Sequence, residues 1–275
     1  MNTKKIISKI TIYAMLLLLS LAAIVPFLWM LSASLKLSKD VFSYPIKWIP
    51  EVFIWENYVT IWKQIPLFTF LGNTSKLTLI ITFLQLATSS LAAYSFAKIE
   101  FKGRDILFVF YISTIAVPWQ VYMIPQYLMV QKFGLVDTHL SLIILQAFSA
   151  FGVFLMRQFY INIPRELSES ARMDGLGEFG IFSRIMLPLV KPGMATLVIF
   201  TFVTIWNDFM GPLIYLNSTS KKTVQLGLRL FVTQFSVDYA SIMAAALVTL
   251  LPVLIVFLAL QKYFVEGIAT SGVKG

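Results

Sequence analysis

The segment RQFYINIPRELSESARMDGLGEFGIFSRIMLPLVK, residues 157 to 191, is the one long polar stretch between two strongly apolar runs of the chain. Pro164 fixes φ near the value needed at a first helical position, and two glutamates follow it in the opening turns, where carboxylates stabilise a helix. Gly175 supplies a residue that can end a helix in the left-handed conformation. The segment therefore predicts a short helix over about residues 164 to 174.

The predicted helix has one small, nearly smooth side. Leu167, Ser170, Ala171 and Asp174 recur at intervals of three and four residues, which places them along the same side of a helix. A surface of this kind suits contact with another protein.

A second helical piece is expected after Gly175. Phe182 and Met186 are spaced four residues apart, so their side chains would pack against each other on a helix. Pro188 and Pro192 follow and are expected to close the loop.

The composition indicates a membrane protein. Hydrophobic residues make up 58% of the chain and charged residues 13%, whereas about a quarter of residues are charged in soluble proteins. The formal charge of +9 comes from basic residues scattered at the ends of apolar runs, so we expect contact with the lipid bilayer and no nucleic acid partner. With no Cys and one His, the chain offers neither disulfides nor a Cys/His metal site, and we expect no bound metal.

Six uncharged or nearly uncharged runs are each about as long as the ~20 residues that a membrane-spanning helix needs. They cover residues 10–35, 77–97, 106–131, 138–156, 192–216 and 239–261. The first run is too long for the core of an ordinary cleaved signal peptide, which is the alternative reading. We therefore expect an all-α membrane protein with six transmembrane helices in a single domain, residues 1–275, with an outer segment at residues 36–76.

The distribution of basic residues predicts the orientation. An even number of spans puts both termini on one side, and short cytoplasmic loops carry more Lys and Arg than outer ones. Residues 98–105 hold Lys98, Lys102 and Arg104, whereas residues 132–137 hold Lys132 alone. Both termini and the central loop at 157–191, between the fourth and fifth spans, are therefore expected in the cytoplasm.

Two of the apolar runs contain polar groups that could line a pathway. Pro118 and Pro125 make a straight helix through the third run improbable, and a bend there would either line a cavity or merely end the span. In the fifth run, Asp208 would lie roughly 25 Å along a continuous helix from Lys191, near the far interface. The candidate pathway residues are Gln120, Gln126, Trp206, Asn207 and Asp208.

The central loop resembles that of the permease subunits of binding-protein-dependent ABC importers. The family motif reads Glu-Ala-Ala, three variable positions, Gly, nine variable positions, Ile, one variable position, Leu-Pro. Here Glu169-Ser170-Ala171 departs from it by one Ser, Gly175 supplies the glycine, and Ile185 and Leu187-Pro188 complete the spacing. In the family this loop forms a coupling helix that sits in a groove on the ATP-hydrolysing subunit. The resemblance assigns that role to Glu166, Glu169, Ser170, Ala171, Arg172, Asp174, Gly175, Phe182, Ile185 and Pro188.

Further similarities point to the carbohydrate-uptake branch related to maltose importers. They include Asn73-Thr74, the residues 92–97, Trp206-Asn207-Asp208 and the tail from Glu266 to Gly275. The branch implies a permease that forms half of a pathway for a sugar or sugar-like solute in a bacterial or archaeal cell membrane. Its implied partners are a second homologous permease, two ATP-binding subunits that use the ATP, and an extracytoplasmic solute-binding protein.

Other functions have less support in the sequence. The chain has no G-x-x-x-x-G-K-[ST] segment to hold ATP phosphates, so ATP hydrolysis is expected in a separate subunit and no cofactor on this chain. An ion-coupled secondary transporter would favour paired broken helices in two repeated halves, and an intramembrane enzyme would need a catalytic set that one His cannot supply. An ABC importer permease for a solute other than a sugar is the nearest alternative.

Overall fold

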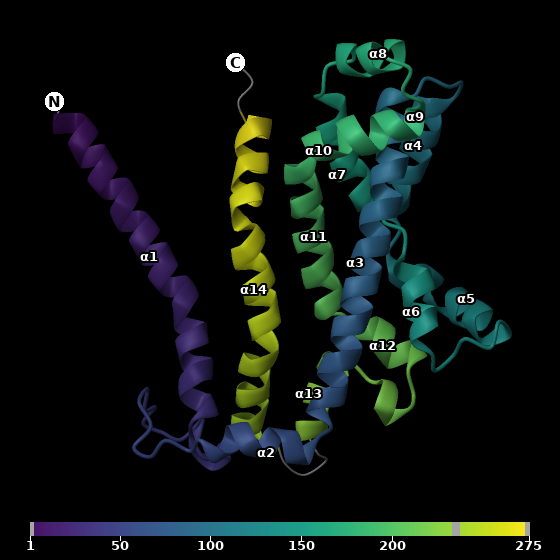
Figure 1. The fold of residues 1–275 in the computed structure, drawn as a ribbon. Helices are drawn as coiled ribbons and strands as arrows, with labels where there is room; N and C mark the ends of the chain where they lie inside the picture. The colour runs from purple at the N-terminus through teal and green to yellow at the C-terminus, as the bar shows by residue number, and fades with distance from the viewer. Residues whose placement is uncertain (1–2, 233–236, 273–275) are drawn as a thin grey trace. The chain divides into compact units, whose positions relative to one another are not determined.

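The computed structural model describes residues 3–232 and 237–272. These residues form helices joined by loops, with one isolated antiparallel bridge between Val232 and Val237 (Figure 1). The described residues divide into two compact units. Unit 1 comprises residues 1–68 and 227–251, and unit 2 comprises residues 69–226 and 252–275.

Unit 1 is built on the long helix α1 and a loop-rich segment after it. Its elements are α1 (Thr3–Ser34), η1 (Ser38–Asp40), α2 (Glu56–Gln64), η5 (Arg229–Phe231) and the first part of α14 (Tyr239–Gly272). Ala33, Val41 and Ala240 form its small apolar core. The amide of Asn57 donates to the backbone oxygens of Ser34 and Lys36, each at 2.8 Å, and so holds α2 against the end of α1.

Unit 2 is the larger one and carries the central loop. Its elements are α3 (Leu67–Lys98, from residue 69), α4 (Arg104–Ser113), η2 (Thr114–Ala116), α5 (Trp119–Lys132), α6 (His139–Gln146), α7 (Ala150–Ile161), α8 (Glu166–Met173), α9 (Glu178–Ile181), the π-helical turn η3 (Phe182–Met186), α10 (Leu187–Leu189), α11 (Lys191–Trp206), α12 (Met210–Tyr215), η4 (Thr219–Lys221) and, at its boundary, α13 (Val224–Leu228). The end of α14 also belongs to this unit.

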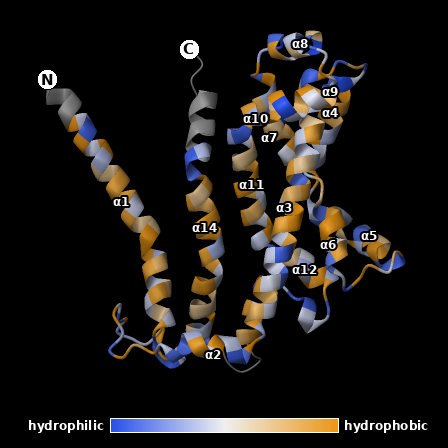
Figure 2. Cartoon of the chain, viewed as in Figure 1, coloured by the Kyte–Doolittle hydropathy of each residue, from blue (hydrophilic) through white to orange (hydrophobic). Residues whose placement is uncertain are grey.

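The described helices contain three to six candidate membrane spans. Three are single helices, at Ile7–Ser34, Leu67–Lys98 and Tyr239–Tyr263, and Figure 2 shows α1 and α14 hydrophobic along most of their length. Three more are bent pairs: α4–η2 with α5 at 96°, α6 with α7 at 41°, and Glu178–Leu189 with α11 at 78°. The all-helical membrane fold is thus confirmed, and six spans result if each bent pair counts as one.

The bend in the third apolar run lies where proline predicts it. The helix stops before Pro118, which lacks a backbone N–H, and α5 starts at Trp119. Pro125, however, lies inside α5 without ending it.

Several predicted boundaries are wrong. The fifth run does not form one helix over 192–216: α11 ends at Trp206, and α12 begins only at Met210. The helix of the second predicted span begins at Leu67 rather than at Leu77. The tail after residue 261 is helical as far as Gly272, and the remaining predicted tail residues lie outside the described ones.

Small residues bring the helices of unit 2 into close contact. A Cβ on Gly152 of α7 would lie 2.4 Å from the Ser89 hydroxyl of α3, closer than real Cβ atoms approach other atoms, and 3.3 Å from Leu197 of α11, which is a tight contact. Because glycine has no Cβ, three helices pack together at this point. Figure 1 shows α8 beside the end of α3 that carries Lys98, with α6 and α12 toward the opposite end of α3.

Candidate functional site

Helix α8 ends at the predicted glycine. The Gly175 N–H donates to the Arg172 oxygen at 3.1 Å, and the Leu176 N–H donates to the Ala171 oxygen at 3.0 Å. This pair of hydrogen bonds is the Schellman motif, which supplies donors to backbone carbonyls that lack a partner at the end of a helix. Gly175 has φ +85°, so the predicted left-handed conformation is confirmed. The helix itself runs over Glu166–Met173, slightly shorter than predicted.

One residue of the predicted smooth side of α8, Ala171, faces the core instead of the surface. Ser168 and Ala171 are buried, and Ala171, 4% exposed, packs into the apolar cluster of unit 2. It therefore does not share an outward face with Ser170 and Asp174, which are exposed. Glu166, Glu169 and Arg172 are exposed as well.

Two apolar side chains on α8 also face outward. Leu167 is 44% exposed and Met173 is 84% exposed, and Phe179 on the following helix α9 is 75% exposed. The outward face of the central loop therefore exposes Met and Phe side chains, residue types that are enriched in protein–protein interfaces. The sequence prediction missed Met173 and Phe179.

Arg172 bonds to Glu178 rather than to its helical neighbour Glu169. Its Nε and Nη2 donate to Glu178 Oε1 at 2.9 and 2.7 Å, and these hydrogen bonds raise the pKa of Arg172. The other oxygen of Glu178 accepts a hydrogen bond from the Tyr94 hydroxyl of α3 at 2.8 Å. The carboxylate of Glu178 thus joins α8, α9 and α3, and Glu169 is left exposed on the outer face.

The second helical piece continues without a break at Pro188. The segment runs through α9, the π-helical turn η3 and α10 to Leu189, and α11 starts at Lys191. Pro188 and Pro192 each lie in the first turn of a helix, where a missing N–H costs nothing, and they stand on either side of the 78° bend between this piece and α11. The exposed Pro188 and half-buried Ile185 follow the buried Phe182 on this piece.

An aromatic cluster holds this piece against α3 and α7. The Tyr94 ring lies 5.3 Å from that of Phe182 and 5.9 Å from that of Tyr160. The Tyr160 hydroxyl in turn shares a 2.6 Å hydrogen bond with Ser90. Buried aromatic groups contribute strongly to packing energy, so a displacement of the loop should also displace α3 and α7.

A polar cleft of about 310 Å³ lies between α8 and the loop that follows α3. On one side Arg165 pairs with Glu100 at 2.7 Å, and Lys98 donates to the backbone oxygen of Ile163. These contacts fix the entry to α8 from the end of α3.

A second cleft of about 390 Å³ lies toward the other end of unit 2, where α5, α6 and α12 meet. We call it the solute cleft, because the predicted pathway residues Gln126 and Asp208 line it. Gln126 Oε1 accepts from Trp119 Nε1 at 2.8 Å and from the Tyr215 hydroxyl at 3.0 Å. Across the cleft, Gln146 Nε2 donates to Asp208 Oδ2 at 2.8 Å, and the Gly211 N–H donates to Asp208 Oδ1 at 3.1 Å. Amides and aromatic rings therefore share one cavity.

The solute cleft contains only some of the predicted pathway residues. Gln126 and Asp208 line it, whereas Gln120 is exposed outside it. Trp206, 2% exposed, stacks on Phe202 at 5.5 Å. Asn207 is exposed, and its amide contacts Val203 and Gln225.

Two glutamines of the solute cleft were missed by the sequence prediction. Gln85 Nε2 donates to the Gln146 backbone oxygen at 2.7 Å, at the break between α6 and α7. Thr201 of α11 donates to Gln85 Oε1 at 3.0 Å. A polar amide inside an otherwise apolar run was the signal that could have identified both residues.

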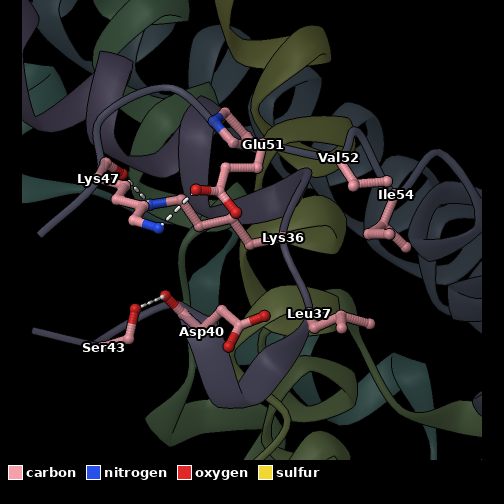
Figure 3. A pocket seen from close by; sticks show the side chains of 9 residues that line it. Lys36, Leu37, Asp40, Ser43, Lys47, Glu51, Val52 and Ile54 are labelled. Carbon is pink, nitrogen blue, oxygen red and sulfur yellow. Dashed lines mark hydrogen bonds and ion pairs between the residues drawn. The ribbon is translucent and has the colours of Figure 1, made fainter.

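Unit 1 has a smaller pocket of about 210 Å³ in the outer segment (Figure 3). Lys47 and Glu51 form an ion pair at 2.6 Å at its edge, and Lys36 donates to the Lys47 backbone oxygen. The Lys36 ammonium also lies 4.6 Å from the centre of the Trp29 ring. The hydrogen bond from Lys36 ties the end of α1 to the following loop.

His139 forms a hydrogen bond with the protein backbone. Its Nε2 lies 2.8 Å from the Lys221 backbone oxygen. Among the described residues, no group of three or more His, Asp or Glu side chains is arranged to hold a metal ion.

Comparison with known proteins identifies relatives over nearly the whole chain. The family model "Binding-protein-dependent transport system inner membrane component" matches residues 85–270. The arabinooligosaccharides transport system permease protein AraQ of Bacillus subtilis (strain 168) is 35% identical over 270 residues, which cover 97% of this chain and 96% of that protein. The lactose transport system permease protein LacG of Rhizobium radiobacter is 30% identical over 259 residues, 94% of each chain.

A solved structure has the same fold. It is the crystal structure of a bacterial ABC transporter involved in the import of the acidic polysaccharide alginate, and one of its chains matches with a TM-score of 0.84. The match covers 96% of this chain and 99% of that chain at 24% identity.

Proposed function

The chain belongs to the family of inner membrane components of binding-protein-dependent transport systems, and we propose that it forms half of the pathway through which a sugar-uptake ABC importer moves its solute. Permease relatives named for arabinooligosaccharides and lactose support the sugar assignment. As a permease component the chain is not an enzyme, and ATP hydrolysis lies in a separate ATPase subunit.

The family implies a partner permease, an ATPase and a solute-binding protein. We propose the specific assembly of this chain with one homologous permease, two ATP-binding subunits and one extracytoplasmic binding protein. The solute cleft supports this pairing, since its lining residue Phe148 is 69% exposed and a second permease could cover it. The solute would then pass between the two permeases.

In the proposed orientation, both termini and the loop at 157–191 face the cytoplasm. The basic residues Lys98, Lys102 and Arg104 beside α8 support this, because short cytoplasmic loops are enriched in Lys and Arg. The solute cleft would then open toward the outer half of a bacterial or archaeal cell membrane.

Helix α8 is proposed as the coupling helix, with Leu167, Glu169 and Met173 as its outward contacts to the ATPase. The observation that carries this proposal is the bonding of Glu178 to both Arg172 and Tyr94. Through it, motion of α8 would reach α3, and the Tyr94–Phe182 contact would pass it to the segment preceding α11. A loop packed so firmly transmits displacement because a close-packed interior deforms little.

The test is transport by the assembled importer in proteoliposomes, with ATP inside and sugar and binding protein outside. Sugar uptake should require ATP, and it should vanish when this chain is reconstituted without its partner subunits. Uptake driven by an ion gradient in the absence of ATP would overturn the proposal.

A further inference from the structure

We infer that the solute cleft of this chain accepts neutral oligosaccharides and rejects sugars that carry a carboxylate, such as uronates. The inference rests on the proposed function, since it names the class of solute that the same pathway would take. It goes further because the relatives include permeases named for uncharged sugars and one named for polygalacturonan and rhamnogalacturonan.

The aromatic groups of the solute cleft suit the apolar faces of sugar rings. Trp119, Tyr122, Phe148 and Tyr215 line it. The partly buried Trp119 is fixed by its hydrogen bond to Gln126, so its ring is preorganised, whereas Tyr215 is buried and only holds Gln126 in place. Rigid aromatic groups offer large contact area at low entropic cost.

The polar groups of the cleft are rich in acceptors. Both oxygens of Asp208 are held in place by N–H donors, from Gly211 and Gln146, and each oxygen keeps a further lone pair for a ligand. Gln146 adds a side-chain oxygen. Sugar hydroxyls can donate to these groups, whereas an ionised carboxylate has no hydrogen to donate.

The charge of the cleft opposes an acidic sugar. Asp208 supplies a carboxylate, and the described side chains that line the cleft include no Lys, Arg or His. In the part of the cleft that this chain forms, a uronate would lose its hydration, gain no cationic partner and meet a like charge. This side of the cleft therefore selects by charge.

The experiment measures binding to the assembled importer in detergent, without the binding protein, so that only the membrane cleft is tested. The probes are the neutral trisaccharide arabinotriose and the anionic trigalacturonate. Isothermal titration calorimetry measures the dissociation constant of each. We expect arabinotriose to bind about tenfold tighter or more than trigalacturonate at neutral pH.

Three variants separate charge from shape. Asp208→Asn keeps the side-chain shape and should reduce the preference severalfold by improving trigalacturonate binding. Gln126→Glu keeps an acceptor for Trp119 and Tyr215 and should increase the preference, which provides a second test if Asp208→Asn fails to assemble. Asp137→Asn removes the same charge outside the cleft and should leave the preference unchanged.

The inference is overturned if trigalacturonate binds as tightly as arabinotriose, or if neither cleft variant changes the ratio. It also fails if the complex binds neither sugar while ATP-driven uptake of arabinotriose is intact, an outcome that leaves the proposed function standing. Absence of ATP-driven uptake of any sugar would instead count against the proposed function.

Discussion

The guanidinium of Arg172 donates two hydrogen bonds to one oxygen of Glu178, at 2.9 Å from Nε and 2.7 Å from Nη2, and so ties the end of α8 to the start of α9. The second oxygen of the same carboxylate accepts from Tyr94. A surface ion pair is thereby connected to a buried tyrosine. This relationship attaches α8 to α3, as the proposed coupling role requires.

The first prediction separates stability from coupling at this contact. The Arg172 and Glu178 side chains are 48% and 45% exposed, so solvent screens the pair. A double-mutant cycle with Arg172→Met and Glu178→Gln should therefore give only a small coupling free energy. Sugar-stimulated ATP hydrolysis should nevertheless fall severalfold in Glu178→Gln, because the link to Tyr94 is weakened. The more exposed pair of Arg165 and Glu100, whose side chains are 61% and 72% exposed, serves as the control.

Tests of this prediction are denaturant unfolding and ATPase assays on the same preparations. If both single variants keep full sugar stimulation, the contact between Arg172 and Glu178 has no part in coupling.

The second prediction concerns Gly175. Its φ of +85° costs a residue with a Cβ roughly 1–2 kcal/mol, and no atom lies within 4 Å of the position that a Cβ would take, so the cost of Gly175→Ala is backbone strain alone. We expect lower stability of the complex and weaker coupling of ATP hydrolysis to sugar. Gly177→Ala is the matched control, since Gly177 has equal space and φ −73°. Equal stability of the two variants would contradict the structure of this turn.

The third prediction tests the solute cleft by steric obstruction. A Cβ on Gly211 would lie 2.5 Å from Asp208 Oδ2 and 3.2 Å from Gln146 Nε2, so Gly211→Ala must displace that contact. Sugar uptake should fall at least tenfold while the ATPase stays bound to the complex. Gly72→Ala, on an open position of α3, should leave uptake unchanged. Normal uptake in Gly211→Ala would remove the cleft from the pathway.

The fourth prediction concerns acid stability of the loop before α6. Asp137 accepts hydrogen bonds from the hydroxyl and N–H of Ser218 and the N–H of Asn217, which hold the pKa of its carboxyl well below the ordinary 3.8. Because the folded pKa is lowered, the ionised group stabilises the fold above pH 3.8, and this contribution is lost as the pH falls through the lowered pKa.

Asp137→Asn removes that titration and keeps a residue type that tolerates the φ of 59° found here. Thermal unfolding from about pH 5 to about pH 3 should therefore decline less steeply in the variant than in the parent protein. Parallel pH profiles would show that Asp137 makes no such contribution.

Local rules of sequence predicted the end of α8 better than its orientation. Gly175 could be predicted because few residues other than glycine adopt a positive φ without strain. The inward face of α8 could not, because a short helix that is polar nearly all round carries no strong periodic signal. Ala171 faces the core because it packs in one cluster with Tyr94 and Ile181. Tyr94 is distant from α8 in the sequence and Ile181 belongs to the separate helix α9, so a local pattern does not reveal this packing.

The break in the fifth apolar run shows a second limit. No proline or glycine lies between Trp206 and Phe209, so the sequence predicts one continuous helix with Asp208 near its far end. In the structure Asp208 accepts from the Gly211 N–H and from Gln146, and the helix stops there. An aspartate three residues before a helical N–H is an N-cap signal, but the Gln146 contact depends on tertiary structure.

The central claim, that α8 contacts the ATPase from the cytoplasm, is tested most directly by photocrosslinking in intact cells. A benzoylphenylalanine residue at Met173, which is 84% exposed on α8, should form a covalent adduct with the ATPase subunit. The same residue at Tyr44, 94% exposed in the outer segment, should form none. Capture of the ATPase from Tyr44, or its absence from Met173 in a complex that still transports sugar, would contradict this account.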